Sequence, residues 1–137
     1  MGSKTQGFSL LEILAVLAIM ALVAVIAAPP VGGMLDKIAF RKEVNGAMAQ
    51  IRGWKLQAVS TGQPVRVLLE EGNLYIKVGR NEARRRQLPQ GVQWTMEPAS
   101  LLFSPEGWAT PATIEIASKQ RRRTLTISPL TGQPEKI

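Results

Sequence analysis

The residues that could do chemistry in this chain are few, and the first of them is a carboxylate in an apolar run. Glu12 is the single charged residue of residues 8–28, a segment of 21 residues. A carboxylate in hydrocarbon costs roughly 2.5 to 3.5 kcal/mol even on lenient insertion scales. The chain has neither Cys nor His, which removes thiolate chemistry, the commonest general base and the commonest zinc ligand. An enzyme is therefore not expected, and Glu12 needs either a position near the membrane surface or a partner.

The basic residues are the second group with chemical meaning. Lys and Arg outnumber Asp and Glu by 17 to 10, which gives a formal net charge of +7. The two arginine runs are Arg84, Arg85, Arg86 and Arg121, Arg122, Arg123. Clustered arginines can bind phosphates or an acidic protein face, and Trp94 and Trp108 could stack on bases. Solvated loops are the simpler interpretation of the two runs, and nucleic-acid binding is the alternative.

The apolar segment must position Glu12. As a helix, 21 residues span about 31 Å, close to one hydrocarbon core. A secretory signal peptide cut near Ala28 is disfavoured, because the run is long, contains a charge and precedes Pro29 and Pro30. A plain uncleaved anchor leaves Glu12 unexplained. The third interpretation is a short polar leader, residues 1–7, that is removed while the apolar segment is kept.

Removal of that leader would give Glu12 a partner. Cleavage after Gly7 creates an α-amine on Phe8, four residues before the carboxylate and about one helical turn away. In a stack of similar helices, the amine of one subunit could also meet the carboxylate of its neighbour. Losing one member of a buried ion pair typically costs about 3–5 kcal/mol, so such a pair would fix the register of assembly. Glu12 is thus a candidate assembly determinant.

Beyond the apolar segment the pattern predicts one helix and then strands. Pro29 and Pro30 remove two backbone donors and predict a kink. An apolar stripe at alternating spacings of four and three predicts an amphipathic helix over residues 34–60 that packs against a sheet. The stripe consists of Phe40, Val44, Ala47, Ile51, Trp54 and Ala58.

From Pro64 onward the apolar period changes to two. The runs VRVLLE and NLYIKV flank Glu71-Gly72 and predict a hairpin. The run RNEARRR is expected to be a loop, and GVQWTM, LLFSPEG, TIEIAS and RTLTIS are expected to be strands or strand ends. Thr131-Gly132 before Pro134 is interpreted as the turn that ends the last strand.

One helix followed by strands indicates an α+β fold, in which a long N-terminal helix packs on an antiparallel β-sheet. The predicted divisions are a leader over residues 1–7, a transmembrane helix half over 8–31, an amphipathic helix half over 32–62 and a sheet region over 63–137.

The run GFSLLEILAVLAI resembles the class III signal of type IV pilins and type II secretion pseudopilins. The resemblance implies that prepilin peptidase cuts after Gly7 and that Phe8 is then N-methylated. It gives Glu12 the role of the assembly glutamate, and it matches Pro29 to a helix-loosening proline of the pilin-like fold.

The second half of the chain resembles the globular part of the H-type minor pseudopilin family, which shares its domain with FimT- and FimU-like minor pilins. The runs LQAVSTGQPVRV, LPQGVQW, LLFSPEGWATPATIEI and LTISPLTGQ carry this resemblance. The matched positions are Phe103, Pro105, Gly107, Thr131 and Gly132. The short end after Gly132 and the run GWK in the helix depart from the family pattern, so secretion pseudopilin and minor pilin both stay open.

The resemblance implies a structural subunit of the type II secretion pseudopilus, which serves protein export across the outer membrane. The alternative is a minor pilin of a type IV pilus, with or without DNA binding. The implied partners are other pseudopilins of the fibre, prepilin peptidase, the inner-membrane assembly platform and inner-membrane lipid. No cofactor or metal is expected. The chain would cross the inner membrane once, with its globular part in the periplasm.

The processing hypothesis predicts the mass of the mature chain. In a host that contains prepilin peptidase, we expect the purified protein to begin at Phe8 and to carry one additional methyl group. Intact-mass and N-terminal peptide mass spectrometry measure both features. A filament-incorporated chain that still contains residues 1–7 would contradict the hypothesis.

Overall fold

The computed structural model describes residues 7, 9–28 and 31–137. The chain divides into two compact units, Met1–Lys37 and Ile38–Ile137. Within the described residues, helices α1 (Leu10–Ala27) and α2 (Val31–Thr61) precede eight strands. The strands are β1 (Val65–Glu70), β2 (Asn73–Val78), β3 (Arg84–Gln87), β4 (Val92–Glu97), β5 (Ser100–Phe103), β6 (Ala112–Ser118), β7 (Arg121–Ile127) and β8 (Pro134–Lys136).

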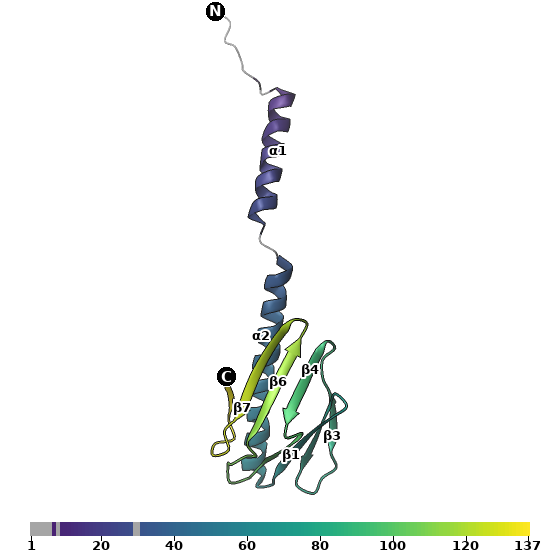
Figure 1. Cartoon of the computed structure of the whole chain (residues 1–137), viewed down its shortest axis with the longest axis vertical. Coiled ribbons are helices and arrows are strands. Elements are labelled where there is room, and N and C mark those ends of the chain that lie inside the picture. The colour runs from purple at the N-terminus through teal and green to yellow at the C-terminus, as the bar shows by residue number, and fades with distance from the viewer. Residues whose placement is uncertain (1–6, 8, 29–30) are drawn as a thin grey trace, which may run out of the picture. The chain divides into compact units, whose positions relative to one another are not determined.

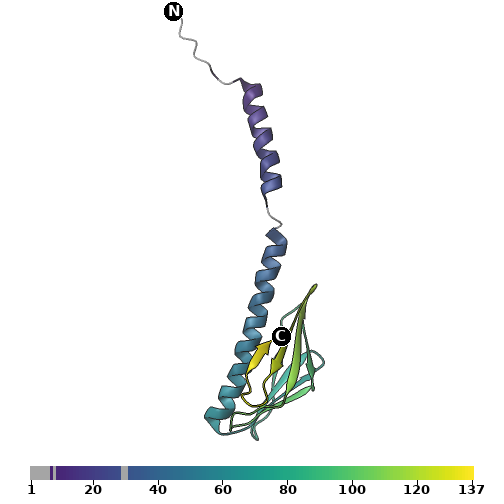
Figure 2. The same ribbon diagram turned by 60° about the vertical axis from the view of Figure 1, so that its left-hand side comes forward.

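The described strands form two antiparallel sheets of four strands each, with the orders β3-β2-β1-β5 and β4-β6-β7-β8. Figure 2 shows the strands along one side of α2. The α+β class, with a helix packed on antiparallel strands, is confirmed, but the strands divide between two sheets rather than forming one. The division does not follow chain order, because the chain crosses between the sheets three times, from β3 to β4, from β4 to β5 and from β5 to β6.

The core lies where the apolar stripe of α2 meets the inner faces of both sheets. The predicted helix over residues 34–60 is confirmed and extends slightly further at each end, as Val31–Thr61. Its buried side chains are Val44, Ala47, Met48, Ile51, Trp54 and Ala58. The strands contribute alternate residues such as Val65, Leu74, Phe103, Ile114 and Leu125. The rings of Trp54 and Phe103 lie 6.2 Å apart between centroids, at 53°, so helix and sheet meet through an aromatic contact.

The predicted hairpin is confirmed at its stated positions. β1 and β2 pair antiparallel with Glu70 opposite Asn73. Both turn residues have positive φ, 49° at Glu71 and 73° at Gly72. A two-residue turn with positive φ at both positions matches the right-handed twist of the flanking strands.

Two predicted boundaries around the arginine runs are wrong. Arg84–Arg86 were expected in a loop, but with Gln87 they form the edge strand β3, paired with β2. β7 begins at Arg121, two residues before the predicted strand, because its hairpin with β6 is closed by Ser118 opposite Arg121. Neither arginine run has the alternation of apolar and polar residues from which a strand is predicted. Backbone pairing with a neighbouring strand places both runs in sheets.

The C-terminal strand β8 was not predicted. The turn before it is confirmed, with φ of +64° at Gly132, but the chain then pairs with β7 over Pro134–Lys136. The Lys136 ammonium donates a hydrogen bond to the Asn45 side-chain oxygen at 3.1 Å. This bond ties the end of the chain to α2, a contact between residues 91 positions apart.

The loop after β5 is organised by one carboxylate. Glu106 Oε2 accepts hydrogen bonds from the Ser104 hydroxyl and from Trp108 Nε1, the latter at 2.9 Å. These two bonds, the Ser104 bond first, lower the pKa of the Glu106 carboxyl because they stabilise its charged form. The Trp108 ring is 46% exposed, so the loop holds an aromatic side chain at the surface.

The position of Ile51 at the centre of the helix–sheet contact predicts a large cost on truncation. Ile51 is 0% exposed, and Ile51→Ala should lower the free energy of unfolding by about 2–5 kcal/mol through lost burial and a residual cavity. Urea unfolding of the full chain in detergent, followed by tryptophan fluorescence, measures this change. The control is Leu56→Ala on the same helix, where the side chain is 68% exposed and the change should stay within about 0.5 kcal/mol.

The Glu106 cluster predicts a pH-dependent loop. Because the folded-state pKa of Glu106 is lowered, its bonds to Ser104 and Trp108 stabilise the loop above the carboxyl's ordinary pKa of 4.5 and are lost as pH falls through the lowered value. The Trp108 indole N–H resonance should shift in that acidic window. Glu106→Gln should remove the titration, and an unchanged titration in this variant would contradict the assignment.

Candidate processing and assembly site

The N-terminal end of α1 begins with a capped first turn. Ser9 is the N-cap, with extended backbone angles of φ −69° and ψ 151°. Its hydroxyl accepts a hydrogen bond from the Glu12 N–H at 3.2 Å, which satisfies one of the helix donors that lack an internal partner. Ser9 and Glu12 have the spacing of a capping box. Glu12 therefore lies in the first turn, where the helix dipole favours a negative charge.

The carboxylate of Glu12 is exposed, and no hydrogen bond or ion pair to it occurs among the described residues. The Ser9 half of the capping box is formed, so the backbone of Glu12 serves the helix while its side chain points elsewhere. Sequence reasoning found the residue from its charge but did not identify this local role. The capping-box spacing was the available signal, and a negative charge at this position is favoured by the helix dipole.

Helix α1 leaves its entire apolar surface uncovered. None of its residues is buried, and its large apolar side chains are between 45% and 81% exposed. Its 18 residues rise about 27 Å, and the helical segment that begins at Leu10 is long and apolar enough to cross a membrane. Such a surface needs lipid or other protein to cover it, which fits a membrane anchor joined to a globular domain.

The other predicted processing residues lie at the ends of α1. Gly7 is exposed and outside the helix, whereas Phe8, Pro29 and Pro30 lie outside the described residues. Cleavage after Gly7, methylation of Phe8 and the proline kink therefore remain predictions. Near the prolines, α1 ends at Ala27 and Ala28 has extended angles of φ −67° and ψ 106°, as is favoured for a residue before proline.

The two arginine runs lie in different sheets. Arg84–Arg86 belong to the edge strand β3, and Arg121–Arg123 begin β7, an inner strand of the other sheet. Arg122 forms an ion pair with Glu115 at 3.5 Å on exposed strands, a contact that contributes little to stability. The proposed anionic-partner patch is thus two separate basic strands in the sheet topology, rather than a pair of loops.

The described residues contain no cluster of three or more His, Cys, Asp or Glu side chains suited to a metal ion. Sequence reasoning also missed the Ser104–Glu106–Trp108 cluster, because the run SPEGW gives a turn but not the partners of its side chains. This cluster places one carboxylate between two donors within a loop. Both bonds join residues of the same loop, so the cluster orders that loop.

Solved structures show the same fold in a pilin. Two crystal structures of the type IV minor pilin FimU from Pseudomonas aeruginosa match, one with 18% identity over 71% of this chain and 91% of that chain, at a TM-score of 0.56. The other matches with 17% identity over 76% of this chain and 92% of that chain, at a TM-score of 0.59. At this identity the likeness concerns the fold, and it confirms the predicted pilin-like architecture. The comparison with curated proteins gives no match.

Family comparisons account for both halves of the chain. Residues 2–28 match the prokaryotic N-terminal methylation motif, a region that contains Gly7 and Glu12. Residues 43–131, from α2 to the turn before β8, match the type II transport protein GspH. The resemblance to an H-type minor pseudopilin and the expectation of a non-enzymatic subunit are thereby confirmed. Because the second match covers well over half of the chain, this protein belongs to the type II transport protein GspH family of structural, pilin-like subunits.

Proposed function

We propose that this chain is a minor pseudopilin of a type II secretion pseudopilus, cut after Gly7 and N-methylated on Phe8. The methylation motif over residues 2–28 and the GspH region over residues 43–131 support this role. Subunits of this family assemble with other pilin-like subunits in a fibre. The observation that carries the proposal is Glu12, an exposed carboxylate at the start of a helix whose apolar surface is wholly uncovered.

The exposed α1 helix supports a membrane location before assembly. An apolar helix of this length suits one bilayer span, with the globular unit on the periplasmic side of the inner membrane. In that arrangement prepilin peptidase and the inner-membrane assembly platform act on the N-terminal segment. The neighbouring subunits would then replace lipid around α1 as the fibre forms.

Charge pairing gives the assembly step its specificity. Apolar helices can slide past one another, because lipid and leucine surfaces are nearly equivalent partners. A carboxylate in that environment is costly unless a cation meets it. The amine created at Phe8 supplies the cation, so the register in which amine and Glu12 meet is favoured over registers that leave either charge unpaired.

A minor pilin of a type IV pilus is the second candidate. The likeness in fold to FimU, which is a type IV minor pilin, favours it. Deletion of the gene in its native host distinguishes the two roles. Loss of protein export with normal pilus-dependent motility supports the secretion role, and the reverse result supports the pilus role.

The pairing mechanism predicts a selective defect for Glu12→Gln. The amide retains the shape and hydrogen-bonding capacity of a capping box but not the charge. We expect normal membrane insertion and a loss of about a hundredfold to a few thousandfold in incorporation, since leaving one member of a buried ion pair without its partner costs about 3–5 kcal/mol. Quantitative immunoblotting of the membrane and sheared-fibre fractions measures both steps.

Val16→Ala is the matched control, because Val16 lies one turn further along the same exposed helix. It should leave incorporation nearly unchanged. Equal incorporation of the Glu12→Gln chain and the unmodified chain would show that the charge of Glu12 is not the assembly determinant.

A further inference from the structure

The strand β3 forms an open edge of the first sheet, and three of its four residues are arginines. It pairs with β2 and has no second strand partner among the described residues. Its sequence is RRRQ, and all four residues are exposed. None of the three arginine side chains has a hydrogen bond or ion pair within the described part of the chain. Figure 1 shows β3 at the outer side of the strand assembly.

The pairing pattern decides which backbone groups of β3 face outward. The two-residue turn at Glu71-Gly72 makes Glu70 and Asn73 a hydrogen-bonded pair. The pattern alternates along β2, so Leu74 and Ile76 direct their backbone groups toward β3. The Leu69 N–H, which donates to Ala99 C=O at 2.9 Å on the far side of β1, follows the same alternation.

The same alternation continues onto β3. Arg86 lies opposite Leu74, and Arg84 lies opposite Ile76. These two arginines therefore bond to β2, whereas Arg85 and Gln87 present their N–H and C=O groups to the open side. The edge offers alternate donors and acceptors with the spacing of a peptide strand. A phosphate could use the donors but has no N–H for the carbonyls.

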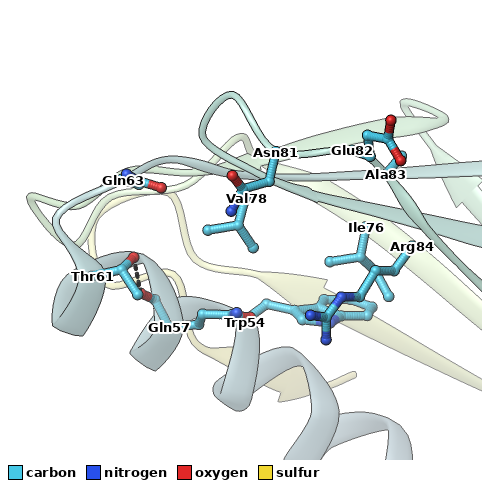
Figure 3. Close-up of a pocket in the computed structure, with 10 residues that line it drawn as sticks. All are labelled: Trp54, Gln57, Thr61, Gln63, Ile76, Val78, Asn81, Glu82, Ala83 and Arg84. Atoms are coloured by element: carbon cyan, nitrogen blue, oxygen red, sulfur yellow. Dashed lines mark hydrogen bonds between the residues drawn. The ribbon is translucent and has the colours of Figure 1, made fainter.

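A groove lies beside this edge, between the end of α2 and the first sheet (Figure 3). Its volume is about 610 Å³, and its lining includes Trp54, Ile76, Val78, Glu82 and Arg84. Arg84 shares the sheet face of Ile76, its direct cross-strand partner, while Arg85 shares the opposite face with Tyr75. A strand added at the edge would thus meet arginines on both faces, with a groove of mixed polar and apolar lining on one of them.

Charge selects among the strands that could dock there. A second copy of β3 would place three arginines against three arginines, and like charges on adjacent strands are destabilising. A segment with carboxylates at those positions would be attracted on both faces. We propose that the open edge of β3 binds an extended acidic segment of another protein as an additional strand. The inference does not depend on the proposed processing at Gly7 or pairing at Glu12.

An eight-residue peptide VEEVEEVE, which carries Glu on both faces of a strand and is labelled with fluorescein, tests this site on the full chain in detergent micelles. Fluorescence anisotropy should show binding that weakens as salt concentration rises. Arg85→Pro and Arg85→Gln both remove the charge, but the proline also removes the outward N–H while leaving the bonds to β2 in place. Arg85→Pro should therefore bind the peptide up to about tenfold more weakly than Arg85→Gln.

Three controls complete the design. Arg122→Gln removes the same charge from the other sheet and should leave the affinity unchanged. Glu82→Gln removes a carboxylate from the groove and should raise the affinity. A peptide with methylated backbone nitrogens at alternate positions keeps its charge but should not bind, because it cannot form a ladder on that edge.

Hydrogen exchange on the unmodified chain provides a measurement that does not depend on a variant folding. The peptide should protect the amides of Arg85 and Gln87, while those of Arg84 and Arg86 should be protected already. The proposal is wrong if the peptide does not bind, if the methylated peptide binds equally well, or if Arg85→Pro matches Arg85→Gln. It is also wrong if a single-stranded oligonucleotide displaces the peptide and binds both variants equally, since the edge would then be a nucleic-acid site.

Discussion

The globular unit depends on the contact between one helix stripe and two sheets. Ile51 and Trp54 lie at the centre of that contact, and Trp54 meets Phe103 across it. In a domain this small the buried area is limited, so both sheets share a single helix as the opposite layer of the core. The bond from Lys136 to Asn45 closes the second sheet onto the same helix. Displacement of α2 would therefore expose the inner faces of both sheets to solvent.

The two helices differ in apolar content and in burial, since α1 is apolar except for Glu12, whereas α2 carries polar and charged residues beside its apolar stripe. α2 buries its stripe within its own chain, whereas α1 buries none of its residues. The first turn of α1 is capped by Ser9, and the large apolar side chains that follow are exposed. The apolar core of the globular unit is thus covered within the chain, whereas the apolar surface of α1 is not.

One edge strand of each sheet, β3 and β8, differs from the other in its contacts and charge. β8 is bound to α2 through Lys136, while β3 is short, exposed and carries three arginines. Charged, short edge strands resist pairing with copies of themselves. The same charge makes the edge selective. Electrostatic attraction favours pairing with an acidic strand, whereas repulsion disfavours pairing with a basic one. A fibre subunit must contact its neighbours in a defined arrangement. An edge strand that disfavours like-charged strands is compatible with that requirement.

The sequence by itself determined the elements whose patterns are local. The spacing of neighbouring residues accounts for three such elements. They are the apolar helix α1, the stripe from Val44 to Ala58 and the hairpin at Glu71-Gly72. Only the tertiary structure decided that the strands divide into two sheets, that Arg84–Gln87 form an edge and that Pro134–Lys136 return to α2. Those features are backbone pairings between distant segments, and such pairing requires no side-chain pattern that a single sequence displays.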